Sequence, residues 1–172
     1  MVVFRLTSSL IIFADSTRLE EHFRIAAPYM TGDSGSRNLG EYSLQGSRQA
    51  DIIGLLFSLQ HLGRLGFGAL IDGRMELAET LRSLLLASGE ARFTGEMDTN
   101  IQCFRPRAES TSSGVAELQR ALARDAEVYV TAPQYRGESW LKTVILNPYT
   151  QASHLAKLVN TFTAHCQRRT PQ

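Results

Sequence analysis

The spacing of apolar residues predicts two long helices in the middle of the chain. In the first, which Ser47 can cap and Gly63 can end, the apolar positions are Ile52, Leu55, Leu56, Leu59 and Leu62. In the second, which stops near Gly89, they are Phe67, Leu70, Ile71, Met75, Ala78, Leu81, Leu84 and Leu85. Apolar stripes of this width must pack on something larger.

The C-terminal half of the chain alternates between strand and helix patterns. Residues 100–104 and 140–146 alternate as strands, and Val128 and Val130 indicate another strand between them. A helix over residues 115–124 precedes this strand, and a final helix is capped by Thr150. The order of strand, helix, strand, strand and helix favours a small antiparallel sheet with helices on one face, an α+β part of an α/β protein.

The first forty residues carry weaker signals. Residues 10–13 read as a short buried strand, and a short helix over residues 17–23 follows it, with Asp15, Ser16 or Thr17 as its cap. Residues 31–41 are rich in Gly, Ser, Asp and Asn, which predicts an ordered loop or an approach to an active site.

Composition narrows the classes of function. The 18 basic and 17 acidic residues leave a net charge of +1, so no bulk field draws the chain to nucleic acid or to an anionic membrane. No apolar run approaches the ~20 residues of a membrane span, and Arg5 interrupts the apolar N-terminus, which argues against a signal peptide. Cys103 and Cys166 form no cluster, so we expect a reduced, cytoplasmic protein.

Several catalytic chemistries lack support in the sequence. The four histidines have no second ligand at helical spacing, which argues against a metal site, and no serine lies in a G-x-S-x-G elbow. Only Lys142 and Lys157 are lysines, and the other basic residues are arginines. An enzyme that needs an amine able to lose its proton has only these two, because arginine stays protonated.

Two positions are candidates for binding an anion. Ser47 and Arg48 open the first long helix, where an arginine opposes the helix dipole and indicates an anionic partner; a solvated or salt-bridged arginine is the alternative. Lys142 shares one face of an apolar strand with Trp140 and Val144. It is either an edge-strand lysine that reaches outward or a lysine that points into a cleft to bind an anion.

Four stretches of the chain carry a family resemblance in sequence order. They are NLGEYSLQGSRQAD, QHLGRLGFGALIDGRMELAE, TNIQCFRP and WLKTVILNPYT. Together they resemble the C-terminal part of the group II pyridoxal-phosphate-dependent amino acid decarboxylases of fold type I, and look closest to the bacterial glutamate- and aspartate-type branch. The resemblance implies that residues 1–46 end the large cofactor domain with an active-site loop, 47–90 form linking helices and 91–172 form a small α+β domain.

The resemblance also implies where the functional residues lie. The family holds pyridoxal 5'-phosphate on a lysine that should fall near Met1 or just upstream, and this chain has no lysine before Lys142. We therefore expect no catalytic residue in this chain and no covalent hold on the cofactor. Lys142 stands where glutamate decarboxylases have an arginine that clamps the substrate carboxylate. Ser47 and Arg48 match the family's Ser-Arg pair, at a wall of the active site near the cofactor or the dimer partner.

Two functions follow from this resemblance. In the first, the chain is the C-terminal segment of a decarboxylase, a carboxy-lyase, that is inactive until an N-terminal cofactor-domain chain joins it. In the second, it is a non-catalytic interaction or regulatory module that pairs with a full-length decarboxylase through a homodimer-type interface. Neither function involves nucleic acid or a membrane.

Overall fold

The computed structural model describes residues 11–25, 39–42, 49–108 and 111–169. The chain divides into two compact units, residues 1–64 and residues 65–172, and each is described by itself. Ser47 and Arg48 lie outside the described residues, as does most of the predicted loop 31–41.

The described residues of the first unit form two short helices and the first part of a long helix. Helix α1 (Ser16–Phe23) is capped by Asp15, whose carboxylate accepts hydrogen bonds from the backbone N–H and the hydroxyl of Thr17 at 3.0 and 2.7 Å, which confirms the predicted helix. The 3₁₀ helix η1 (Leu39–Tyr42) carries Glu41, which pairs with Arg24 at 2.9 Å. The strand expected at residues 10–13 is wrong for residues 11–13, where the described structure has no strand, and residue 10 lies outside the described residues.

Helix α2 (Asp51–Ala87) combines both predicted long helices across a kink at Gly63. Gly63 has φ 61° and ψ −179°, a backbone conformation that only glycine adopts readily. The bend therefore falls where the sequence predicts the end of the first helix. The second part of α2 supplies Ala78, Leu81 and Leu85 to the core of the second unit, and all three are fully buried.

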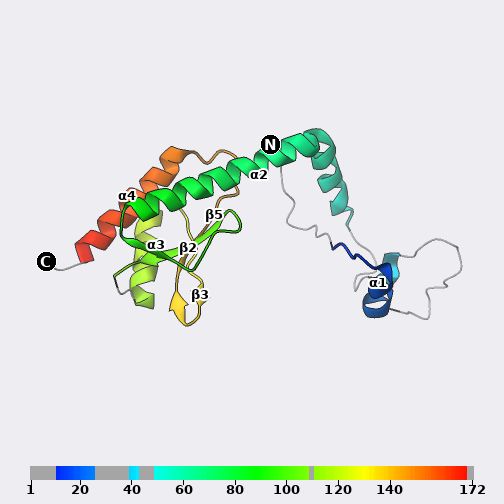
Figure 1. The fold of residues 1–172 in the computed structure, drawn as a ribbon, viewed down its shortest axis with the longest axis horizontal. Coiled ribbons are helices and arrows are strands. Elements are labelled where there is room, and N and C mark those ends of the chain that lie inside the picture. Colours follow the sequence, from blue (N-terminus) through cyan, green and yellow to red (C-terminus); the bar gives the residue numbers. More distant parts are fainter. Residues whose placement is uncertain (1–10, 26–38, 43–48, 109–110, 170–172) are drawn as a thin grey trace, which may run out of the picture. The chain divides into compact units, whose positions relative to one another are not determined.

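Three antiparallel strands form the sheet of the second unit, in the order β1-β2-β5 (Figure 1). They are β1 (Ala91–Phe93), β2 (Ile101–Pro106) and β5 (Leu141–Val144). A hairpin of β3 (Gln134–Tyr135) and β4 (Glu138–Ser139) precedes β5. The strand expected around residue 129 is absent from the described structure, where this segment contributes only a bridge from Thr131 to Lys142.

Helices α2, α3 and α4 share one core with one face of the sheet (Figure 1). Helix α3 (Ser112–Asp125) is capped by Thr111, whose hydroxyl accepts the N–H of Gly114 at 3.2 Å. Helix α4 (Ala152–Arg169) begins two residues after Thr150, the expected cap. Phe104 and Phe162 meet edge to face in this core, with ring centroids 5.4 Å apart. The predicted α+β layout, with helices on one face, is confirmed.

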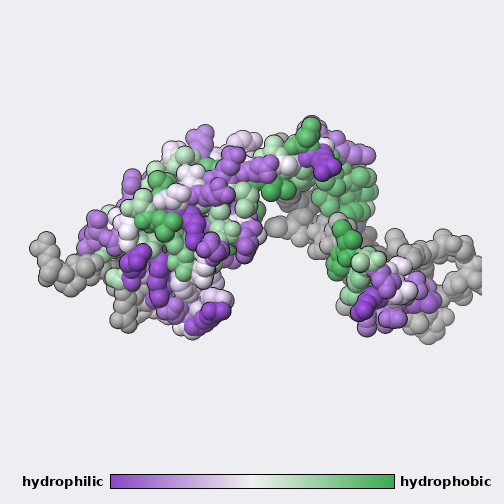
Figure 2. Space-filling model, viewed as in Figure 1, coloured by the Kyte–Doolittle hydropathy of each residue, from purple (hydrophilic) through white to green (hydrophobic). Residues whose placement is uncertain are grey.

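The first part of α2 exposes apolar side chains that the described chain does not cover (Figure 2). We call this set the α2 apolar surface, and it consists of Ile52, Ile53, Leu56, Phe57 and Leu59. By length and composition alone, α2 could also cross a membrane, although helices that pack inside soluble proteins pass the same test. At about 3.6 residues per turn these five side chains fall within one half of the helix circumference, so they form one broad apolar face.

Candidate functional site

The sheet has an outer face, on the side opposite the three helices. Because side chains alternate along a strand, the residues that share this face are Arg92, Ile101, Cys103, Arg105, Trp140, Lys142 and Val144. The register pairs Arg92 with Arg105, Cys103 with Lys142 and Ile101 with Val144. The outer face thus has a basic row, a middle row with Lys142 and an apolar row.

Lys142 lies in β5, the last strand in the order β1-β2-β5, and an isolated bridge joins it to Thr131 on its other side. Its backbone N–H donates to the carbonyl of Thr131 at 2.7 Å, and its carbonyl accepts from the N–H of Thr131 at 3.1 Å. On the other side its strand pairs with β2 through Cys103. Lys142 is half-buried, and none of the described carboxylates forms an ion pair with it. Lys142 is therefore a cation on the outer face of β5, and the edge-strand and anion-binding interpretations both stay predictions.

The surroundings of Cys103 change the pKa of its thiol. Burial raises the pKa of Cys103, and the ammonium group of Lys142 partly offsets the rise by favouring the thiolate. Burial has the larger effect, so the thiol is neutral at physiological pH. The middle row therefore presents one positive charge and no negative one.

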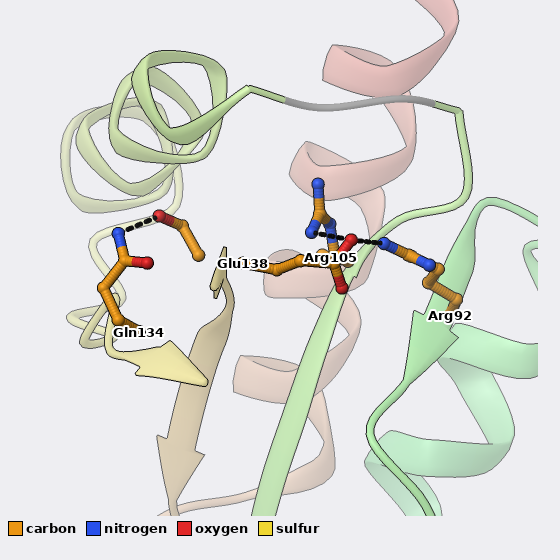
Figure 3. A network of polar contacts seen from close by, with 5 residues as sticks. Arg92, Arg105, Gln134 and Glu138 are labelled. Atoms are coloured by element: carbon orange, nitrogen blue, oxygen red, sulfur yellow. Dashed lines mark hydrogen bonds and ion pairs between the residues drawn. The ribbon is translucent and has the colours of Figure 1, made fainter. Parts of the chain in front are cut away.

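The basic row is organised around Glu138 of the hairpin (Figure 3). The carboxylate oxygen Oε1 of Glu138 lies 2.5 Å from a terminal nitrogen of Arg92 and 2.9 Å from a terminal nitrogen of Arg105. Both guanidinium groups also lie over the indole of Trp140, at 5.3 and 5.6 Å from the ring centroid. Two arginines thus share one carboxylate and one aromatic ring.

The second lysine has a different environment. Lys157 of α4 donates to Glu127 at 2.7 Å beside a groove of about 500 Å³, and it holds the pKa of that carboxyl below its usual range. Both side chains are largely exposed, so the pair adds little to stability.

Comparison with known protein families identifies the family to which the chain belongs. The model of the pyridoxal-dependent decarboxylase conserved domain matches residues 1–107, which is more than half of the chain. The chain therefore belongs to the pyridoxal-dependent decarboxylases, and pyridoxal phosphate is the cofactor of the complete enzyme. No curated protein matches the sequence.

Solved structures share the fold at low identity. Catharanthus roseus tryptophan decarboxylase is similar with a TM-score of 0.63 and 15% identity, over 77% of this chain and 29% of its own. Mouse CSAD is similar with a TM-score of 0.64 and 16% identity, over 81% of this chain and 32% of its own. Oryza sativa TDC, solved with PLP and tryptamine, is similar with a TM-score of 0.67 and 14% identity, over 78% of this chain and 30% of its own. The chain thus spans about a third of the length of these relatives.

The described residues do not fit pyridoxal phosphate by themselves. The cofactor's aldehyde needs an amine that can lose its proton, and the chain offers only two lysines. Lys157 already donates to Glu127, and Lys142 lies on the sheet with no described carboxylate or histidine beside it. The two arginines of the outer face, Arg92 and Arg105, are already bound to Glu138.

The sequence predicted one cation of the outer face, Lys142, but not the cluster of arginines beside it. Lys142 was found, and its face of the strand is confirmed by the low exposure of the alternate residues Leu141 and Thr143. The site roles of Lys142, Ser47 and Arg48 stay predictions. The cluster of Arg92, Arg105 and Glu138 was missed, because its members come from three strands with no common spacing. The one signal was Trp140, two residues before Lys142 on the same face.

Proposed function

We propose that this chain supplies the small domain and the substrate-carboxylate contact of a pyridoxal-phosphate-dependent amino acid decarboxylase. The observation that carries the proposal is Lys142, a half-buried cation on the outer face of β5, without a described carboxylate partner. A lysine ammonium in that position can bind an anionic group as a point charge. The division into residues 1–46, 47–90 and 91–172 belongs to the same proposal.

The charge of the outer face favours an acidic substrate. Among the described residues this face carries three cations, Arg92, Arg105 and Lys142, and Glu138 is the carboxylate that binds two of them. The net positive charge attracts amino acids with a second acidic group, such as glutamate or aspartate. A lysine binds such a group as a point charge, without the two-pronged geometry that an arginine would add.

The partner that completes the enzyme covers the α2 apolar surface in this proposal. That surface is one broad apolar face of the helix, which an N-terminal cofactor-domain chain or a full-length homologue would bury. The same observation favours the second candidate, a non-catalytic module that pairs with a full-length decarboxylase. Cys103 and Cys166 are free thiols, which supports a cytoplasmic location.

A reconstitution experiment tests the proposal. The chain is mixed with the separately produced cofactor-binding part of a related decarboxylase, and the visible absorbance of bound cofactor and the release of CO₂ from glutamate or aspartate are measured. We expect turnover, and we expect Lys142→Met to raise the KM for the acidic substrate about tenfold, because one charge-assisted contact is lost. Lys157→Met is the matched control and should leave the KM unchanged.

Other outcomes separate the alternatives. Binding to a full-length decarboxylase without any gain in turnover would favour the interaction module. A mixture that never gains bound cofactor would overturn the catalytic proposal. Partition of the chain into lipid vesicles would assign the α2 apolar surface to a membrane instead of a protein.

A further inference from the structure

The basic row crosses the outer face as one continuous cluster. Arg92 and Arg105 are paired in the register of β1 and β2, and Trp140 lies one residue beyond the pair of Phe104 and Leu141. Both guanidinium groups bind the same oxygen of Glu138 (Figure 3). Both also lie over the indole ring of Trp140. The cluster therefore holds two positive charges against one negative charge.

Burial makes the counter-charge important. The side chain of Arg105 is only 5% exposed, and a guanidinium at that depth is costly without an anion beside it. Glu138 provides the anion from the hairpin, whose turn residues Arg136 and Gly137 have φ values of 50° and 77°. Gln134 also donates to the hydroxyl of Ser139 at 2.9 Å, which ties the two hairpin strands together.

The basic row lies close to Lys142. Trp140 and Lys142 are two residues apart on one face of a strand, a separation of about 7 Å. A carboxylate attracted to Lys142 is thus within reach of the neighbouring arginines. The indole Nε1 of Trp140 is a buried donor with no acceptor in the described chain, so this row has a spare hydrogen bond to offer.

We propose that Glu138 determines specificity by filling the basic row, so that a ligand carboxylate binds at Lys142. The inference rests on the proposed function of Lys142. Without Glu138, Arg92 loses its described carboxylate partner, and together with the indole N–H of Trp140 it forms a second carboxylate site. That second site would hold an acidic substrate one row away from Lys142.

Trp140 reports on this site directly, because it is the single tryptophan of the chain. Its indole N–H resonance is followed by NMR while succinate is added to the full chain, with sodium chloride at matched ionic strength as the reference. In Glu138→Gln we expect succinate to shift the indole signal with at least about tenfold tighter apparent binding than in the wild type. The gain should persist in Glu138→Gln/Lys142→Met and disappear in Glu138→Gln/Arg92→Gln.

The controls keep the outcomes distinct. Glu138→Asp retains the negative charge and should behave as the wild type, and Glu138→Ser replaces Glu138→Gln if the latter fails to fold. No gain in succinate binding on loss of Glu138, or a gain that requires Lys142, would overturn the inference. If the weak binding of succinate to the wild type survives Lys142→Met, the proposed function of Lys142 is contradicted. The effect of Glu138→Gln on succinate binding still tests the role of the basic row in that case.

Discussion

The two faces of the small sheet carry opposite chemistry on adjacent residues. The inner face, under the helices, presents Phe104 and Leu141, both fully buried, whereas the outer face presents Lys142 and Arg105 from neighbouring positions of the same strands. Each face also has one of the two lysines near it, since Lys157 lies on a covering helix and is bound to Glu127. Alternation along a strand thus lets two pairs of adjacent residues supply both the apolar core and a charged outer face.

The inner face is not purely apolar. Gln102 and Thr143 face each other across β2 and β5, and both are buried. The side-chain oxygen of Gln102 accepts from Arg82 at 3.3 Å, while its amide nitrogen and the Thr143 hydroxyl have no partner in the described chain. The inner face is therefore mainly apolar, with two buried polar residues. Substitutions on the two faces test how much each face contributes to stability.

The largest expected effect is on the inner face. Phe104→Ala removes a fully buried ring that packs against Phe162, so we expect the free energy of unfolding to fall by about 3 to 5 kcal/mol. The matched outer-face change, Val144→Ala, should cost under about 1 kcal/mol because Val144 is 39% exposed. Urea unfolding measures both. Equal losses at the two positions would break the distinction between the faces.

A smaller effect is expected at Lys142. Lys142→Met should change the free energy of unfolding by less than about 0.5 kcal/mol. It should raise the pKa of Cys103 further, since the cation that favours the thiolate is removed. The rate of alkylation of Cys103 as a function of pH, followed by peptide mass analysis, measures this shift. An unchanged profile would mean that the ammonium group does not act on the thiol, and Lys157→Met serves as the control.

The smallest effect concerns the lysine on the helical side. Lys157 lowers the pKa of Glu127 in the folded chain, so the pair stabilises the fold above the ordinary glutamate pKa of about 4.3, and this contribution is lost as the pH falls through the lowered value. Glu127→Gln should therefore unfold at a slightly lower temperature than the wild type at neutral pH. The two melting temperatures should converge in acid. A gap that persists there would contradict an ionic origin.

The sequence predicted the helices and the inner face better than the rest. Periodicity located α2, α3 and α4 because each has a broad apolar stripe, and alternation located β2 and β5. The strand β1 was missed because it has only three residues, and β3 and β4 have two each. The expected strand around residue 129 was wrong because alternation does not supply a neighbour to pair with, and Tyr129 is 82% exposed.

The candidate site was predictable only where one residue carried the signal. Lys142 stands out from its strand because it is charged among apolar neighbours. The basic row depends on register, and register joins Arg92 to Arg105 over a separation that no local pattern specifies. The position of Glu138 depends in addition on a turn with positive φ values at Arg136 and Gly137. An arginine rarely adopts a positive φ, so the sequence does not predict this turn.

The kink at Gly63 has a consequence for how the long helix holds together. A helix propagates its order through successive backbone hydrogen bonds, and the extended ψ of −179° at Gly63 interrupts that series. The piece before the kink begins at Asp51 and is about as short as an isolated helix can be in water. We expect its amide hydrogens to exchange with solvent far faster than those around Leu81, so that α2 opens as two separate cooperative segments.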